Sequence, residues 1–330
     1  MDPGTNNNNN QNDPEPTEEL IPLMSIDEAK AQIQDPNSDS WAKYNALYHL
    51  RTHATPEVGQ ILIDSYPNLG TSSLLRHEVM YIMGQMRLPS SYPFLKAKMN
   101  DPEELPVVRH EAGEALANYH HMKEECLTEM QKHWDSPVEL LKSTVRVGIH
   151  KLNNYKSDTE SRYGKKYGGT IEPAEPFNEV ELREFLKIAQ DDQEADLVAL
   201  AREKLLSSYE EVDEYPKYRI CYYLRDLNSK ESKRVLAELM WKENREFISA
   251  LLRHEVSFIL GQIYESDKYI VDTLKQVCYD DTEHPVVRHE AILAFWEIAK
   301  DEELVERLKA HKDQLVRESV VCAIRMAGGC

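Results

Sequence analysis

The sequence predicts an all-α protein, an α/α solenoid of helical hairpins in two pseudo-symmetric halves that face each other. Apolar residues recur at spacings of three and four, as in Leu75, Val79 and Ile82, which is typical of helices with one buried face. No convincing run of alternating apolar and polar residues indicates a strand. The chain also repeats itself on two scales, a few tens of residues and half its length, as stacked hairpins do.

The first element is a tail over residues 1–21, which we predict to be disordered. It is rich in Asn, Pro and acidic residues, with consecutive asparagines from Asn6 to Asn10. Such a segment cannot bury enough apolar surface to offset the entropy lost on ordering it.

An N-terminal half over residues 22–152 and a C-terminal half over residues 179–330 follow. The stretches that begin at Leu74 and Leu251 read LLRHEVMYIMGQ and LLRHEVSFILGQ, which are identical at nine of twelve positions. PVVRHEA occurs once in each half, and KYNALYHLR in the first half is echoed by KYRICYYLR in the second. We therefore expect about four stacked hairpins in each half.

Helix starts are marked within these repeats. Ser72 and Ser73 precede the first LLRHEV stretch and are typical N-cap residues. Pro106 and Pro285 begin the two PVVRHEA stretches, where a first-turn proline is well tolerated.

The segment 153–178 lies between the halves and is rich in Gly, Lys, Ser and Pro. It has no periodic apolar face, so we predict an exposed linker.

Composition excludes several classes of protein. The net charge of −19 argues against nucleic-acid binding, which needs Lys and Arg, and suits a cationic substrate or basic partner, although solubility alone also explains it. Five scattered cysteines without a Cys-x-x-Cys pair, and no signal peptide, indicate reduced thiols in the cytoplasm or the nucleus. No apolar run reaches the ~18 residues of a membrane span.

Four Arg-His-Glu triplets are the most informative motif. The histidines are 33 residues apart in the first half and 35 apart in the second, and the two pairs are separated by 177 and 179 residues. Because stacked repeats bring equivalent positions side by side, neighbouring triplets should form one cluster, and facing halves should join two clusters. The triplets contain His77-Glu78, His110-Glu111, His254-Glu255 and His289-Glu290.

Four imidazoles and four carboxylates in duplicate suggest a two-metal site. Each metal could take two His and one Glu with open positions, the facial arrangement of non-haem Fe(II) enzymes that use dioxygen. Two such triads use all four histidines and two of the four acids. The internal symmetry leaves two choices of ligand, either Glu111 with Glu290 or Glu78 with Glu255.

A packing role for the triplets is the alternative. Repeats copy structural residues as well as functional ones, and an Arg beside a Glu often forms a salt bridge. Stacking is normally achieved by Leu, Ala and Val, however, and four buried carboxylates without a cation would be costly. A non-enzymatic scaffold with structural Arg-His-Glu ion pairs is therefore the second hypothesis, which metal content would separate from the first.

On these motifs, the chain resembles the deoxyhypusine hydroxylases, a family of HEAT-repeat di-iron monooxygenases. The resemblance covers about residues 25–152 and 179–330 and includes Val316-Arg317-Glu318-Ser319 near the C-terminus. It implies hydroxylation of the deoxyhypusine side chain of translation initiation factor 5A, two non-haem Fe ions per chain and dioxygen as co-substrate. We expect no nucleic-acid or membrane partner and a monomeric chain. A HEAT-like bilin lyase is a further alternative, which the duplicated triplets disfavour.

The resemblance also implies a division of roles among the eight side chains. The family's metal ligands match His77, His110, Glu111, His254, His289 and Glu290. The remaining acids, Glu78 and Glu255, match positions linked to binding the substrate amines.

Three residues depart from the family pattern. Val107 and Val286 stand where Met is usual, and Leu293 replaces a Glu that Glu114 keeps in the first half. None of these is a ligand, so the changes bear on the shape of the pocket.

Overall fold

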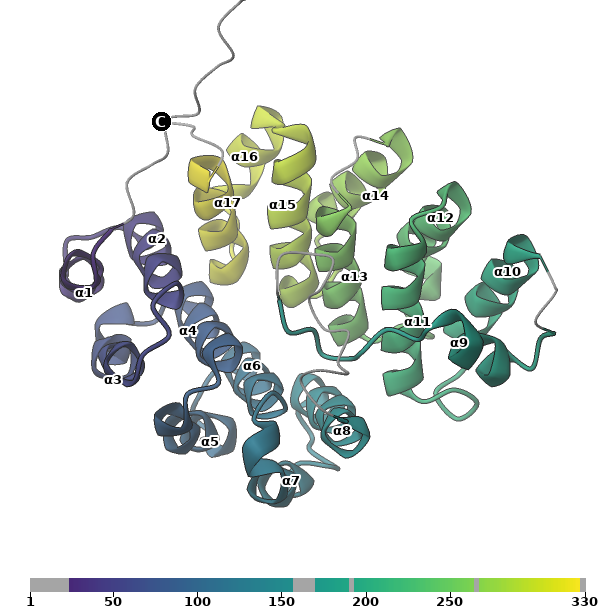
Figure 1. The fold of residues 1–330 in the computed structure, drawn as a ribbon. Coiled ribbons are helices and arrows are strands. Elements are labelled where there is room, and N and C mark those ends of the chain that lie inside the picture. Colours follow the sequence, from purple (N-terminus) through teal and green to yellow (C-terminus); the bar gives the residue numbers. More distant parts are fainter. Residues whose placement is uncertain (1–23, 157–169, 190–192, 264–266, 327–330) are drawn as a thin grey trace, which may run out of the picture.

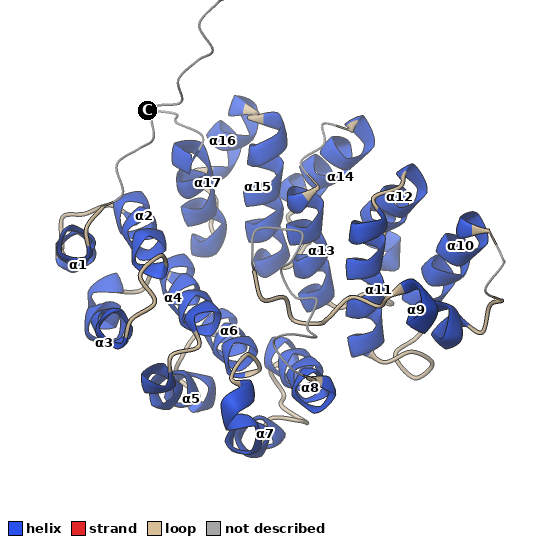
Figure 2. Cartoon of the chain, viewed as in Figure 1, coloured by secondary structure: helices blue, strands red, loops and turns tan. Residues whose placement is uncertain are grey.

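The computed structural model describes residues 24–156, 170–189, 193–263 and 267–326. The predicted tail 1–21 lies outside the described residues, as does the part of the predicted linker between 157 and 169. All regular structure in the described ranges is helical, which confirms the all-α prediction (Figure 2). No helix in these ranges is long and apolar enough to cross a bilayer.

The helices form two layers (Figure 1). The inner layer consists of α2 (Ser40–Arg51), α4 (Ser73–Met86), α6 (Pro106–Leu116), α8 (Glu139–Asn154), α11 (Glu214–Leu227), α13 (Ala250–Gln262), α15 (Pro285–Ala299) and α17 (Gln314–Met326). The outer layer consists of α1 (Ile26–Gln34), α3 (Pro56–Ser65), α5 (Tyr92–Asn100), α7 (Lys123–Gln131), α10 (Glu194–Leu205), α12 (Lys230–Glu238), α14 (Lys268–Tyr279) and α16 (Glu302–Leu308). Helix α9 (Glu179–Leu186) precedes the second half, and short 3₁₀ turns occupy Tyr66–Leu69, Pro89–Ser91, His120–Met122 and Lys242–Asn244.

The inner helices form a closed ring. Each one packs against the next from α2 to α8 and from α11 to α17. Helix α8 then contacts α11 and α13, while α17 contacts α2 and α4. The two halves therefore face each other across the centre of the molecule and meet at two seams (Figure 1).

The N-termini of the inner helices follow the predicted signals. Ser72 caps α4 by accepting a hydrogen bond from the amide of Leu75, and Ser249 caps α13 in the same way from Leu252. Pro106 and Pro285 are the first residues of α6 and α15, as predicted. The duplicated sequences thus give duplicated helices with the same starting points.

Two hydrophobic cores correspond to the two halves, and helices at the seams contribute to both. Leu140 and Val147 of α8 are buried in the core of the second half. Leu315 and Cys322 of α17 are buried in the core of the first half. Since each half completes the core of the other, apolar burial as well as polar contact holds the ring closed.

The prediction of an exposed linker is wrong for residues 170–177, which we call the strap. Glu172 and Ala174 are fully buried, and Phe177 is nearly so. Gln85 of α4 exchanges two hydrogen bonds with the backbone of Ile171, at 2.8 and 3.2 Å. The Gly- and Lys-rich composition of the whole linker concealed a short segment of mixed polarity, whose Glu172, Ala174 and Phe177 are buried between the halves.

Glu172 anchors the strap through both its side chain and its backbone. Arg225 of α11 donates to its carboxylate at 2.7 Å, and Lys151 of α8 donates to its carbonyl at 2.6 Å. Arg225 and Lys151 are themselves almost completely buried. The strap is therefore tied to α8 and α11 by fully buried groups and to α4 by the partly buried Gln85.

Candidate metal centre

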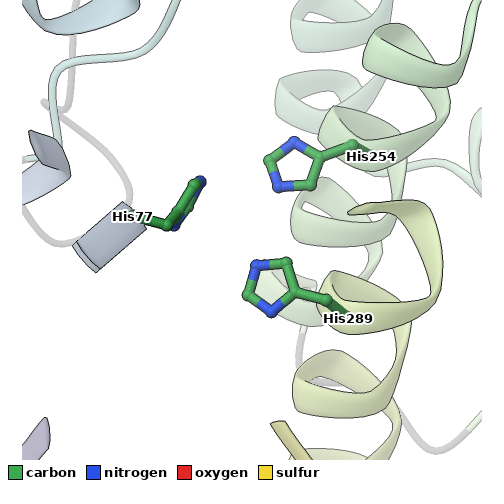
Figure 3. A group of neighbouring side chains, drawn as sticks. All are labelled: His77, His254 and His289. Atoms are coloured by element: carbon green, nitrogen blue, oxygen red, sulfur yellow. The ribbon is translucent and has the colours of Figure 1, made fainter. Parts of the chain in front are cut away.

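The four triplet histidines meet at the centre of the ring. His77 and His110 come from adjacent helices α4 and α6, and His254 and His289 from adjacent helices α13 and α15. Figure 3 shows His77 facing His254 and His289 across the gap between the halves. The ring centroid of His77 lies 5.6 Å from that of His110 and 5.4 Å from that of His289. The structure thus brings together the residues that the duplication suggested would meet.

In each half, two imidazole nitrogens converge on one carboxylate oxygen. Oε2 of Glu111 lies 3.1 Å from Nε2 of His77 and 3.8 Å from Nε2 of His110. In the second half, Oε2 of Glu290 lies 3.7 Å from Nε2 of His254 and 3.4 Å from Nε2 of His289. The two halves therefore present matching sets of two His and one Glu.

Two overlapping groups have ligand atoms close enough to share one cation. One contains His77, His110 and Glu111, and the other contains His77, His254 and His289 across the gap. His77 belongs to both groups, so the donor atoms of the two halves form one continuous cluster.

The imidazole nitrogens at the centre fit a metal because their only polar neighbours are the other members of the cluster. The Nε2 atoms of all four histidines are buried and make no hydrogen bond. An unpaired buried polar atom is unfavourable, and four at one point are unusual in a folded protein. A cation at the centre would satisfy them together.

The opposite ring nitrogens of His110 and His289 are held from outside the cluster. Nδ1 of His110 lies 3.3 Å from Oγ1 of Thr144, and Nδ1 of His289 lies 3.0 Å from Oγ of Ser319. Thr144 and Ser319 occupy equivalent places in α8 and α17, and each donates its own hydroxyl to a carbonyl one turn earlier. Such partners orient a ligating imidazole and fix which nitrogen faces the metal.

Burial keeps three of the imidazoles neutral, which is the form that binds a metal. It lowers the pKa of His254 to about 3, and the charge on His77 adds to this effect. Burial, again with His77, holds the pKa of His110 and His289 well below the usual value. At His77, burial also lowers the pKa, but contact with Glu111 outweighs it and the pKa is raised.

The acids at the centre repel one another. Burial, followed by the charges of Glu78 and Glu255, raises the pKa of Glu290 to about 8. Burial is also the main reason that the pKa of Glu255 is raised to about 7. Without a cation these carboxyls would hold protons near neutral pH, so a bound cation would be stabilised by the cluster.

Glu78 and Glu255 lie beside the triads and have partners of their own. Tyr48 donates to Oε2 of Glu78 at 2.6 Å, and Tyr222 donates to Oε1 of Glu255. The two tyrosines occupy the same position in the KYNALYHLR and KYRICYYLR repeats. Our interpretation of the sequence did not identify these tyrosines, although their duplication in the two repeats was a usable signal.

A cavity of about 650 Å³ opens onto the cluster. Its wall includes His77, Glu111, His254 and Glu290 together with both acids beside the triads. Thr170–Pro173 of the strap form another part of the wall, so the segment expected to be an exposed linker shapes the site. Leu293 and its equivalent in the first half, Glu114, also line this cavity. Val286, another departure from the family pattern, is buried in the core of the second half.

The arginines of the triplets point away from the centre and support the repeats. Arg76 pairs with Glu104 at 2.8 Å, and Arg253 pairs with Glu283 at 2.8 Å. The alternative hypothesis of structural ion pairs therefore holds for these arginines, but it leaves the histidine cluster unexplained.

Several proteins of known identity are similar to this chain over nearly its whole length. It is 31% identical over 311 residues to the deoxyhypusine hydroxylase of Homo sapiens, which covers 93% of this chain and 92% of that protein. It is 30% identical over 311 residues to the enzyme of Mus musculus, with 93% of each chain covered. A solved structure of human deoxyhypusine hydroxylase in complex with glycerol superposes with a TM-score of 0.74, at 27% identity, over 92% of this chain and 96% of the other. No protein-family model matches the chain.

Proposed function

The chain belongs to the deoxyhypusine hydroxylase family, and we propose that it hydroxylates the deoxyhypusine side chain of translation initiation factor 5A at a non-haem di-iron centre, with dioxygen as co-substrate. The observation that carries the proposal is the pair of matching triads. Each half directs two imidazole Nε2 atoms at one carboxylate oxygen, and all four Nε2 atoms are buried without partners.

In this proposal the ligands are His77, His110 and Glu111 for one iron and His254, His289 and Glu290 for the other. Two-His, one-carboxylate sets leave coordination positions open, which suits iron that reacts with dioxygen. When bound, the iron pair would supply the oxygen chemistry. Hydroxylation places one oxygen atom in a C–H bond and reduces the other to water, so an external donor must supply two electrons and two protons.

The protein itself would bind and orient the substrate. Deoxyhypusine carries two amines that are protonated near neutral pH, and a buried ammonium requires an acidic partner. Glu78 and Glu255 line the cavity on either side of the triads, and Tyr48 and Tyr222 hold their carboxylates in place. A side chain fixed at two amines would present a chosen carbon to the centre.

The closed ring supports a monomeric enzyme. Both triads, both tyrosine–glutamate pairs and the strap lie within one chain. No residue from a second copy is needed to complete the cavity wall described here.

Metal analysis joined to an activity assay tests the proposal. Protein purified without chelators should contain two irons per chain and should convert deoxyhypusine-bearing factor 5A only when dioxygen and a reductant are present. Zinc in place of iron, or a metal-free protein with an intact fold, would favour the non-enzymatic scaffold. A protein that contains two irons but does not convert deoxyhypusine would support the proposed metal centre and contradict the proposed substrate.

A further inference from the structure

Arg109 is the one triplet arginine that has no acidic partner among the described residues. It is 91% buried and donates from Nε to the carbonyl of Met99 at 3.1 Å. In the part of the chain that the structure describes, no acceptor is present for its two terminal nitrogens. These nitrogens are not among the fully buried polar atoms that lack a partner, so they reach solvent, and a guanidinium that always keeps its charge can bind an anion there.

The equivalent arginine in the second half has the missing acid. Arg288 pairs with Asp281 at 2.9 Å and also contacts His311. Asp281 precedes the first residue of its helix, Pro285, by four positions, and the residue at the same place before Pro106 is Pro102. The first half therefore has the equivalent arginine, Arg109, but has Pro102 in place of the carboxylate.

An open cavity of about 460 Å³ occupies the place where this acid would be. It is lined by Pro102 and Arg109 and by the loop after α7, including Lys132, His133 and Trp134. It is separate from the cavity at the metal centre, since the two walls share no residue.

The charge of this outer cavity is positive in a strongly acidic chain. Asp135 is the only acid in its wall, but its side chain is 86% exposed and its carboxylate pairs with Arg146 at 3.3 Å. Lys132 pairs with Glu129, but the carboxylate of Glu129 is divided between Lys132 and Lys96. Arg109 therefore remains without a matched charge in an enclosure that can exclude part of the solvent.

We propose that this outer cavity is a binding site for a carboxylate group, which would take the place that Asp281 fills in the other half. The planar fork of Arg109 matches two carboxylate oxygens, and Lys132 supplies a second donor at the rim. The carboxylate comes from a small organic acid or from an acidic side chain of a peptide. The site does not depend on the proposed hydroxylase function.

The test compares two substitutions of Pro102 in the full-length chain. Pro102→Asp supplies the acid that the second half has, and Pro102→Asn has nearly the same shape without the charge. Succinate, a terminally blocked aspartate and inorganic phosphate are titrated at constant ionic strength with chloride as the reference. Binding is measured by calorimetry and by the rise in melting temperature that a ligand of the folded state produces.

Both carboxylates should bind wild type and Pro102→Asn and raise their melting temperatures, and neither should bind Pro102→Asp. Pro102→Asp should also melt at a higher temperature than Pro102→Asn without ligand. Equal binding to Pro102→Asp and Pro102→Asn, no binding to wild type, or binding of phosphate alone would overturn the proposal. Tighter binding of succinate would identify a free acid as the source, and tighter binding of the blocked aspartate would identify a peptide.

A second pair of variants covers the case in which Pro102→Asp does not fold. Lys132→Glu places a negative charge at the rim of the outer cavity and should weaken carboxylate binding roughly tenfold or more. Lys312→Glu makes the same change at an exposed site in the other half and should leave the affinity unchanged. Equal affinities in the two variants would show that the ligand binds elsewhere.

Discussion

The carboxylate of Glu318 accepts a hydrogen bond from the backbone amide of Leu74, 3.1 Å away, although the two residues are 244 positions apart. The same oxygen accepts from Oγ of Ser72 at 2.9 Å. The last helix of the chain thus caps the N-terminus of α4, the helix that carries His77. A negative charge at this end also stabilises the helix dipole.

Replacing Glu318 with Ala should lower the free energy of unfolding by about 1–2 kcal/mol, because α4 loses a charged capping group and the seam loses a contact. Chemical denaturation monitored by circular dichroism measures this loss. Glu306→Ala is the control, since Glu306 is 69% exposed and pairs only with its helical neighbour Lys309. Equal losses in the two variants would show that the cap contributes nothing to closure of the ring.

The two cavity tyrosines should position the carboxylates of Glu78 and Glu255, which we propose bind the substrate amines. Tyr48→Phe and Tyr222→Phe each remove a hydrogen bond to Glu78 or Glu255. A hydrogen bond to a charged group is worth about 1.5–3 kcal/mol, so KM should rise roughly ten- to a hundredfold while iron stays bound. Tyr223→Phe changes the next residue on α11, which does not line the cavity, and should leave KM unchanged. Loss of iron from Tyr48→Phe or Tyr222→Phe would instead place the tyrosines in the metal site.

The four acids should separate into two classes. Glu111→Ala and Glu290→Ala should lose iron, because each removes the carboxylate on which two imidazoles converge. Glu78→Ala and Glu255→Ala should keep iron and bind substrate more weakly. Iron content and substrate affinity of the four variants decide between the two ligand choices that the symmetry of the sequence leaves open. If Glu78→Ala and Glu255→Ala are the variants that lose iron, the roles are reversed.

The strap should be held mainly by its buried ion pair. Glu172→Gln removes the fully buried carboxylate that pairs with Arg225 and leaves only the partly exposed carboxylate of Asp226, which we expect to cost about 1.5–3 kcal/mol in stability. Asp272→Asn breaks the pair between Lys268 and Asp272, in which both side chains are at least half exposed, and should cost less than about 1 kcal/mol. Denaturant unfolding gives both values. A small loss in Glu172→Gln would mean that the strap is fixed by its apolar residues alone.

The sequence predicted the features that depend on local signals or on the duplication of the two halves. The helix starts at Ser72, Pro106 and Pro285 and the meeting of the four histidines follow from caps, periodicity and duplication, and the structure confirms them. The strap was predicted wrongly because its burial depends on partners far away in the chain. Gln85, Lys151 and Arg225 each belong to a different helix, so no local pattern reveals that they meet at Ile171 and Glu172.

The proposed division of roles between the four acids also lies beyond local pattern. All four stand in the same triplet, and only the three-dimensional register shows that Glu111 and Glu290 are the ones between paired imidazoles. Glu78 and Glu255 instead face tyrosines from the preceding inner helix. The four acids have the same local sequence, so what distinguishes them is which side chains of the neighbouring repeat they contact. A sequence does not state those contacts directly.

Closure of the ring has a consequence for how proteins of this shape can change over time. An open array of helical hairpins can gain or lose a hairpin at either end, because each hairpin contacts only its neighbours. Here α17 packs against α2 and α8 against α11, so the number of inner helices is set by the circumference. An added or deleted hairpin would break a seam and move the two histidine pairs out of reach of each other. Variation in length should therefore accumulate in the loops and at the chain ends, while the count of hairpins stays fixed.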